Sequence, residues 1–160
     1  MTKNSKKPEP GELRERALRL LARREHSRFE LSRKLGQAGF AQHEIDPLLD
    51  DFEERKWLSD RRFAESWVAD HRTRSGSVKL AYELRQRGVG EAIIEDVLRE
   101  NPDSELERAR EVWMKKFASA PADANEKARQ MRFLQARGFT PEVIRRVITD
   151  RDDRLSVLDP

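Results

Sequence analysis

The sequence contains no cysteine and is poor in both glycine and proline, with seven of each among its 160 residues. The absence of cysteine excludes a disulfide framework, a zinc site with thiolate ligands and a cysteine nucleophile. So few glycines and prolines disfavour a β-sandwich with its many turns, whereas the plentiful Ala, Leu, Arg and Glu are typical of helices. We therefore expect an all-α fold.

Long apolar runs are also missing from the chain. No stretch approaches the roughly 20 apolar residues of a membrane-spanning helix, and the start, MTKNSKKPEPGE, lacks the apolar segment of a signal peptide. Hydrophobic residues make up 36% of the chain and charged residues 39%, which favours thin layers of amphipathic helices over one thick core. We expect a soluble, cytoplasmic protein with no membrane partner.

A repeat runs through the sequence and is marked by three glycines. Gly39, Gly88 and Gly138 are separated by 49 and 50 residues, and a leucine stands four residues before each of them. Apolar residues recur at the same three positions after each glycine: Ile45, Leu48 and Leu49, then Ile94, Val97 and Leu98, then Ile144, Val147 and Ile148. A fixed period of this length indicates a repeat architecture.

Each of these glycines is predicted to end one helix in the left-handed conformation before a tight turn into the next helix. In the last copy Thr140 is the expected N-cap and Pro141 the first helical residue, whereas Gly90 and Ala41 take the cap position in the other copies. One more amphipathic segment precedes each pair of helices. The prediction is therefore three tandem three-helix repeats, built as helix-turn-helix-like units.

The repeats and the segments around them have the following expected bounds: a flexible N-terminal tail 1–11, repeats 12–58, 59–101 and 102–150, and a C-terminal tail 151–160. One repeat buries too little apolar surface alone, so neighbouring repeats should stack into an elongated, curved array. Large aromatic side chains are expected to fill the repeats and their junctions: Phe52, Trp57, Phe63, Trp67, Trp113, Phe117, Phe133 and Phe139.

Charge alternates along the repeats, although the net charge is only +3. Residues 14–34, 70–90 and 127–146 sum to +5, +3 and +5, whereas residues 42–60 and 91–107 sum to −5 and −6. A DNA-reading helix-turn-helix would place the acidic helix that follows the turn in the major groove, against phosphate. Sequence-specific reading is therefore disfavoured, while the basic middle helices can follow a phosphate backbone.

The basic residues beside the turns and loops are the candidate binding residues. We select Arg28, Lys34, Arg72, Arg74, Lys79, Arg85, Arg87, Arg129, Arg132, Arg137 and Arg145. Arginine suits phosphate and carboxylate alike because its planar fork donates two parallel hydrogen bonds. The sequence leaves DNA and an acidic protein surface open as partners, and local ion pairs within the chain are the competing explanation.

Residues typical of catalysis or metal binding are scattered. His26, His43 and His71 have no second histidine at helical spacing that would complete a metal site. The chain also lacks a P-loop, a dinucleotide-type glycine pattern and a nucleophile elbow. We expect no catalytic residues, no metal site and no cofactor.

Three segments resemble successive signatures of the RecX family, bacterial regulators of RecA: ALRLLARREHSRFELSRKLGQAGF, LSDRRFAESWVADHRTRSGSVKLAYELRQRGV and RFLQARGF. The middle signature is the most specific, and is carried by Asp60, Phe63, Ala64, Arg72, Gly76, Leu84 and the Arg87–Gly88 pair. The resemblance covers most of the chain, and a threefold helical repeat is also the family's fold. Ala38 before the first glycine and the long connection ASAPADANEK depart from the family pattern.

The resemblance implies a non-enzymatic modulator of RecA, mainly an inhibitor, that lies in the groove of the RecA filament on single-stranded DNA. It would restrain filament extension, ATP hydrolysis, strand exchange and coprotease activity in DNA repair and the SOS response. The implied partners are RecA and single-stranded DNA, with non-specific double-stranded DNA as a further candidate. The chain itself is expected to be a monomer.

Two expectations follow from combining this resemblance with the charge pattern. The acidic third helices are expected to face basic RecA surface through Asp50, Asp51 and Glu95. The alternative function is a free-standing, sequence-neutral nucleic-acid-binding repeat protein. Steep salt dependence of binding in the absence of RecA would favour that alternative.

Overall fold

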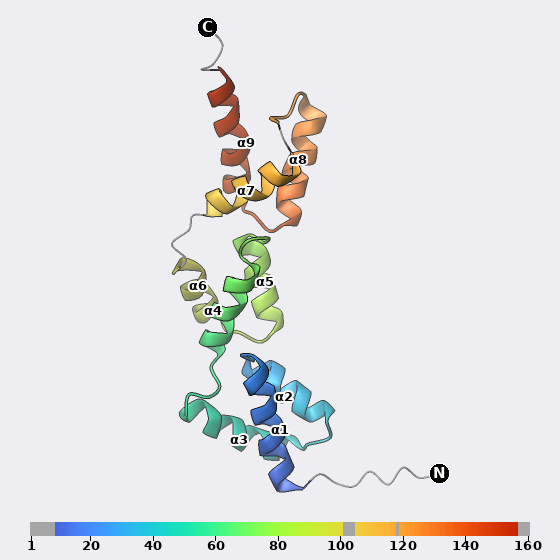
Figure 1. Cartoon of the computed structure of the whole chain (residues 1–160), viewed down its shortest axis with the longest axis vertical. Coiled ribbons are helices and arrows are strands. Elements are labelled where there is room, and N and C mark those ends of the chain that lie inside the picture. The colour runs from blue at the N-terminus through green and yellow to red at the C-terminus, as the bar shows by residue number, and fades with distance from the viewer. Residues whose placement is uncertain (1–8, 101–104, 118, 157–160) are drawn as a thin grey trace, which may run out of the picture. The chain divides into compact units, whose positions relative to one another are not determined.

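The computed structural model describes residues 9–100, 105–117 and 119–156, of which residue 10 and residues 150–156 are described by their backbone alone. Within these residues the chain forms helices and no strand (Figure 1). The helices are α1 (Pro10–Arg23), α2 (Arg28–Gln37), α3 (Gln42–Glu54), α4 (Asp60–His71), α5 (Ser77–Gln86), α6 (Glu91–Arg99), α7 (Glu105–Lys116), α8 (Ala124–Ala136) and α9 (Pro141–Ser156). The prediction of an all-α chain of three three-helix repeats is confirmed.

The same C-terminal motif closes the second helix of every repeat. Gly39, Gly88 and Gly138 have φ angles of 100°, 78° and 87°, as the glycine spacing predicts. The Gly39 N–H donates to the Gly36 carbonyl at 3.1 Å and the next N–H donates to the Leu35 carbonyl at 3.2 Å. These two bonds define a Schellman motif. Both recur at the other two glycines, and the motif explains the leucine four residues earlier, which is buried in each copy.

The third helices start where the cap residues predict. They begin at Gln42, Glu91 and Pro141, and the Val143 N–H donates to Thr140 Oγ1 at 3.3 Å. The ends of the helical region differ from the predicted tails. Helix α1 already begins at Pro10, and α9 continues to Ser156 instead of ending at the predicted boundary before residue 151.

The chain divides into two compact units, and the division between them runs through the middle repeat. Unit 1 comprises Met1–Ser66 and Leu84–Ile94, and unit 2 comprises Trp67–Glu83 and Glu95–Pro160. Unit 1 therefore holds α1 to α3, unit 2 holds α7 to α9, and α4 to α6 contribute to both. The elongated, curved array stays a prediction.

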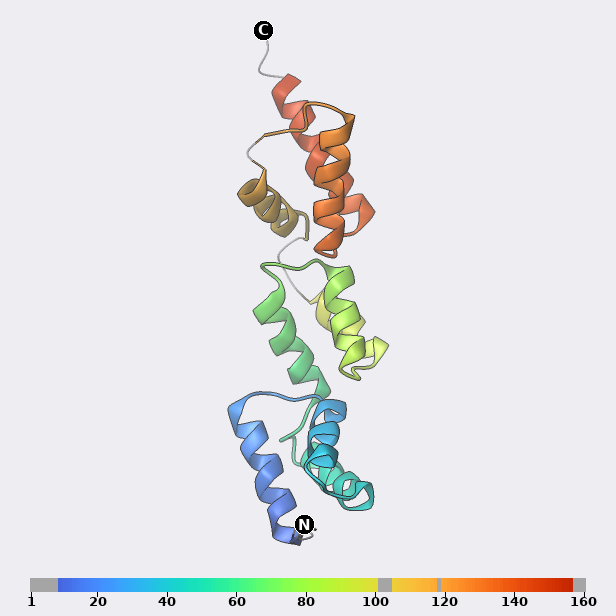
Figure 2. The same cartoon turned by 90° about the vertical axis from the view of Figure 1, so that its right-hand side faces the viewer.

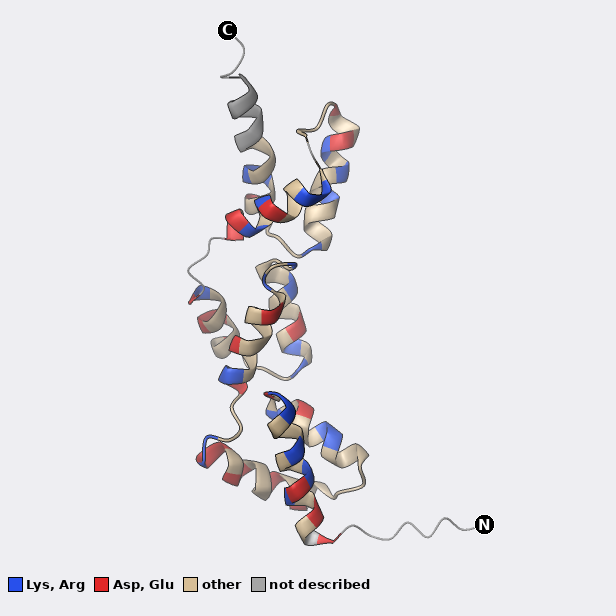
Figure 3. Cartoon of the chain, viewed as in Figure 1, with Lys and Arg blue, Asp and Glu red and all other residues tan. Residues whose placement is uncertain are grey.

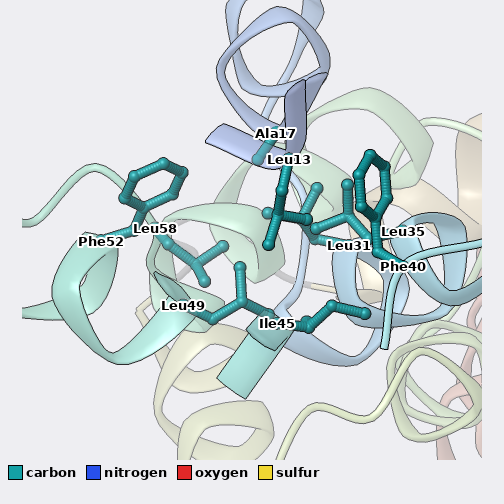
Figure 4. Close-up of a cluster of buried hydrophobic side chains, with 9 residues drawn as sticks. All are labelled: Leu13, Ala17, Leu31, Leu35, Phe40, Ile45, Leu49, Phe52 and Leu58. Carbon is teal, nitrogen blue, oxygen red and sulfur yellow. The ribbon is translucent and has the colours of Figure 1, made fainter. Parts of the chain in front are cut away.

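The core of unit 1 lies where α2 packs against α1 and α3. Figure 4 shows Leu13 and Ala17 of α1 above the leucines of α2 and the apolar face of α3. The buried residues of this cluster are Leu13, Ala17, Leu31, Leu35, Phe40, Ile45, Leu49, Phe52 and Leu58. Each of the three helices thus supplies one apolar stripe, as the amphipathic patterns predict.

The core of unit 2 is formed by the mutually packed helices α7, α8 and α9 (Figure 2). Trp113 of α7 is 1% exposed, and its Nε1 donates to Oε1 of the buried Gln130 at 2.9 Å. Phe117 meets Phe133 edge to face, with 5.2 Å between ring centroids. The indole N–H and the glutamine oxygen therefore satisfy each other inside an otherwise apolar core.

The prediction that every large aromatic side chain lies in the core is wrong for one residue. Trp57 is 42% exposed. Its ring lies 5.5 Å from the ring of the core residue Phe52, and 5.7 Å and 5.1 Å from the guanidinium groups of Arg14 and Arg55, so Trp57 borders the core and two cations cover part of its ring. Trp67 and Phe133 are only partly buried, whereas the other five predicted aromatics are buried.

In unit 1, the N-terminus of α2 is bound by two segments that follow it in the next repeat. Ser27, the N-cap, accepts from the Glu30 N–H at 3.1 Å and donates its own hydroxyl to the Arg87 carbonyl at 2.6 Å. The Arg28 N–H donates to the Asp60 carboxylate at 2.8 Å. These contacts satisfy the unpaired N–H and carbonyl groups at the two helix ends.

The same junction occurs one repeat later, within unit 2. The Ser77 N–H donates to Glu105, the first residue of α7, at 3.0 Å. The Gly76 N–H donates to the Arg137 carbonyl at 2.8 Å, and the Val78 N–H donates to the Gly138 carbonyl at 3.0 Å. Successive repeats are therefore joined by docking the start of a second helix on the next repeat's first helix and glycine turn.

A buried histidine stabilises the segment between α1 and α2. His26 is 1% exposed, with Nδ1 3.0 Å from the Arg24 carbonyl and Nε2 3.0 Å from Lys34 Nζ. The ring therefore donates through Nδ1 and accepts from the ammonium through Nε2, which requires neutral imidazole. Burial is the main cause that lowers the pKa of His26 below its usual 6.5, and the charges of Arg24 and Lys34 act in the same direction.

We expect the free energy of unfolding to fall as the pH drops below about 6.5, because the unfolded chain then takes up a proton that folded His26 resists. Urea unfolding at pH 7.5 and at pH 5.5 measures this loss. The variant His26→Gln should show a smaller loss between the two pH values. His43→Gln, which changes an exposed histidine, is the control and should behave like the wild type; an unchanged loss in His26→Gln would contradict the assignment.

Candidate nucleic-acid interface

Many cations of unit 1 are bound by carboxylates of the same unit. Arg28 contacts Asp50 at 2.6 Å and Glu53 at 3.1 Å, both on α3, whose acidic residues are red in Figure 3. Asp51 is held by Arg55 at 3.0 Å and by Arg14 at 3.5 Å. The predicted DNA-binding Arg28 and the predicted RecA-facing Asp50 are thus partners of each other.

Four more of the selected residues have roles within the fold. Lys34 binds His26, and Arg85 forms a two-point ion pair with Glu91. The Arg87 carbonyl accepts a hydrogen bond from the Ser27 hydroxyl, and the Arg72 carbonyl accepts one from Arg108 Nη1 at 2.8 Å. For the side chains of Lys34 and Arg85, local contacts account for the position without a ligand.

Unit 2 differs because many of its cations form no ion pair within the part of the chain that the structure describes. The exposed ones are Arg74, Lys79, Lys115, Lys116, Arg129, Arg132, Arg145 and Arg146, and Arg137 is partly buried. Unpaired surface cations can displace the counterions of a nucleic-acid backbone, which is the main source of non-specific affinity. The structure therefore separates the selected basic residues into an internally paired set and an available set.

Four of the available cations surround one hollow of about 330 Å³, here called the basic pocket. Its lining is Thr73, Arg74, Val112, Lys115, Lys116, Phe133 and Arg137. The Phe133 ring centroid lies 5.8 Å from Lys116 Nζ and 5.3 Å from the Arg137 guanidinium. The pocket thus combines an apolar lining with cations and contains no carboxylate in its lining.

The sequence predicted two of these pocket cations and missed the other two. Arg74 and Arg137 were selected beside their turns, and Arg137 Nη1 lies 3.4 Å from the Arg74 carbonyl across 63 residues of sequence. Lys115 and Lys116 lie at the end of α7. The adjacent lysines in WMKKFA are a visible signal, but the charge sums beside the glycine turns stop at residue 107 and resume at residue 127, so they leave out both lysines.

Other features of the described residues are less suited to a binding site. A hollow of about 490 Å³ in unit 1 is lined by both signs of charge, including Glu53, Asp60, Lys56, Arg61 and Arg62. No group of three or more His, Asp or Glu side chains among the described residues is arranged to hold a metal ion. None of the described helices is long and apolar enough to cross a membrane.

Comparison with known proteins assigns the chain to a family. Family models for the first, second and third three-helix domains of RecX match residues 14–52, 59–98 and 103–148. This chain belongs to the RecX family. It is 42% identical to the regulatory protein RecX of Ralstonia pickettii (strain 12J) over 147 residues, which are 92% of each chain. It is 45% identical to the regulatory protein RecX of Chromobacterium violaceum over 141 residues, 88% of this chain and 91% of the relative.

Solved RecX structures have the same fold. The crystal structure of RecX from Lactobacillus salivarius matches with a TM-score of 0.79 at 21% identity, over 89% of this chain and 96% of that chain. A second crystal structure, of regulatory protein RecX, gives a TM-score of 0.77 at 22% identity, over 88% of this chain and 73% of that chain. The predicted family and fold are both confirmed.

The repeat junctions and the basic pocket can now be assigned to the RecX domains. Asp60, Gly76 and Gly88, from the most specific signature, all lie at the two repeat junctions of the structure. Thr73 and Arg74 come from the second RecX domain, while the rest of the pocket comes from the third. The pocket therefore depends on the junction between these two domains, both parts of which lie in unit 2.

Proposed function

We propose that this RecX-family chain modulates RecA, mainly as an inhibitor, by binding in the groove of the RecA filament on single-stranded DNA. In this role it restrains filament extension, ATP hydrolysis, strand exchange and coprotease activity, and it catalyses no reaction itself. The observation that carries the proposal is that RecX domains account for most of the chain, with relatives named regulatory proteins.

The distribution of charge supports unit 2 as the part that contacts DNA. Its unpaired cations are free to bind phosphate, whereas the arginines of unit 1 that hold acidic side chains must first break those ion pairs. Among the acidic candidates for RecA contact, Asp50 and Asp51 are already bound by arginines. Glu95 is exposed on α6 and forms no ion pair within the described residues, so we propose it as the RecA-facing carboxylate.

The test is RecA-catalysed ATP hydrolysis on single-stranded DNA while this protein is added well below the RecA concentration. A filament modulator should reduce the rate at that low ratio, because one molecule in the groove affects many RecA subunits. Binding should also be stronger to the assembled filament than to bare DNA. Inhibition only when the protein is abundant enough to cover the DNA would replace the proposal with simple nucleic-acid binding.

A further inference from the structure

The basic pocket of unit 2 has the features of a site for one nucleotide. We propose that it holds a single unpaired nucleotide of single-stranded DNA, with the phosphate among Arg74, Lys115, Lys116 and Arg137 and the base against Val112 and Phe133. This inference rests on the proposed function for the choice of DNA as ligand. To the proposed function it adds the location of a DNA-binding site, the residues that form it and a preference for single-stranded DNA.

Charge in the pocket favours an anion. Four cations share one hollow whose lining contains no carboxylate, and none of the four forms an ion pair within the described part of the chain. Like charges gathered in this way repel one another in the free protein, and a bound phosphate relieves that repulsion. Arginine can bind phosphate through two parallel hydrogen bonds, while lysine acts as a point charge.

The apolar lining favours an unpaired strand over a duplex. Duplex DNA presents phosphates on its surface and keeps its bases stacked inside, so Val112 and Phe133 would have no base to contact. A nucleotide of single-stranded DNA can turn its base onto an aromatic side chain while the backbone follows the cations. The hollow of about 330 Å³ is also of a size for one such group, since ligand pockets for small molecules start near this volume.

The junction holds two of the cations in place before any ligand arrives. The Arg137 carbonyl accepts from the Gly76 N–H at 2.8 Å, and its guanidinium lies against the Arg74 carbonyl. Arg108 Nη1 donates to the Arg72 carbonyl at 2.8 Å and to the Ser75 carbonyl at 3.0 Å, which fixes the loop on both sides of Arg74. Such preorganisation lowers the entropy lost on binding.

The test measures fluorescence anisotropy of labelled DNA with the full chain and without RecA. The probes are a thymidine strand, a strand of the same length whose central sites lack bases, and a duplex. The thymidine strand should bind about tenfold more tightly than the abasic strand. The duplex should bind more weakly than the thymidine strand.

Two variants separate the two parts of the pocket. Lys115→Ala/Lys116→Ala should weaken both single strands and reduce the slope of log affinity against log salt by up to about 0.7, the contribution of the one phosphate that the pocket binds. Phe133→Leu should remove the preference for the strand with bases and leave the salt slope unchanged. The charge-matched control is Arg16→Ala/Arg23→Ala, because these exposed arginines of α1 form no ion pair in the described part of unit 1; it should retain the preference and most of the affinity.

Several outcomes would overturn the proposal. Equal binding of thymidine and abasic strands by the wild type would remove the base contact, and this result does not depend on whether Phe133→Leu folds. An equal loss of DNA affinity in the control variant would mean that binding is spread over many surface cations and is not centred on the pocket. Displacement of the strand by thymidine monophosphate at concentrations that match unlabelled strand would assign the pocket to free nucleotides. Since RecA is absent, these failures leave inhibition of RecA untouched and are distinct from failure of the proposed function.

Discussion

Replacing Gly138 with alanine should destabilise the protein much more than replacing Gly39, although both glycines occupy the same position of the same motif. Both have a left-handed backbone, with φ of 87° and 100°, which costs an alanine about 1–2 kcal/mol. A Cβ at Gly39 meets nothing within 4 Å. A Cβ at Gly138 would overlap the Lys79 Cβ and lie 2.6 Å from its backbone nitrogen.

The overlap at Gly138 cannot be relieved by a flexible side chain alone, because backbone atoms of α5 are involved. Moving the turn away would also lengthen the hydrogen bond from the Val78 N–H to the Gly138 carbonyl, which is 3.0 Å in the structure. We therefore expect a loss of about 3 kcal/mol in the free energy of unfolding for Gly138→Ala. For Gly39→Ala the expected loss is about 1 kcal/mol.

Urea unfolding followed by circular dichroism measures both losses. Gly39→Ala is the matched control, since it shares the strained backbone and lacks the overlap. Gly76→Ala is a second probe of the junction, because its Cβ would lie 2.5 Å from the Gly138 carbonyl oxygen. Similar losses for Gly39→Ala and Gly138→Ala would mean that the glycine turns matter only for backbone conformation and that the junction contributes little.

The helices and their turns were predictable because their causes are local in sequence. The Schellman motif depends on a glycine and on a leucine four residues before it, and the N-cap depends on residues such as Thr140 that immediately precede a helix. The recurring apolar positions and the capping residues are therefore enough to identify the three repeats. The place where α9 ends was not predictable in this way, because the apolar period stops at Ile148 while the helix continues to Ser156.

The junctions between repeats could not be predicted because their partners lie far apart in sequence. Asp60 reads as an ordinary N-terminal carboxylate of its own helix, yet it accepts from the N–H of Arg28 in the preceding repeat, 32 residues away. The burial of His26 depends likewise on neighbours that a list of charged residues does not reveal. Composition and period describe single helices, whereas such contacts depend on how helices pack.

The candidate site was predicted only as a set of residue types. An arginine in the sequence has the same charge whether it holds a carboxylate, as Arg28 does, or lacks an ion pair among the described residues, as Arg132 does. The charge sums correctly located basic segments but could not separate these two cases. The basic pocket could not be predicted from the sequence either, because it combines a loop after α4 with the ends of α7 and α8.

The two kinds of arginine should respond differently to substitution. Arg132→Gln/Arg145→Gln/Arg146→Gln should lower the affinity for single-stranded DNA by tenfold or more at low salt and reduce the salt slope by about 2. The free energy of unfolding should stay the same, because these side chains are exposed and form no ion pair among the described residues. Arg28→Gln should leave DNA affinity nearly unchanged and cost about 1 kcal/mol of stability.

The cost at Arg28 has a specific cause. Its guanidinium lies among Asp46, Asp50 and Glu53 of α3, at 4.0, 2.6 and 3.1 Å, so its removal leaves three neighbouring carboxylates without their shared cation. Urea unfolding and anisotropy titrations across salt concentrations, carried out on the same preparations, separate stability from affinity. If Arg28→Gln lost as much DNA affinity as the triple variant, the ion pairs of α3 would open on binding, and unit 1 would have to be included in the DNA interface.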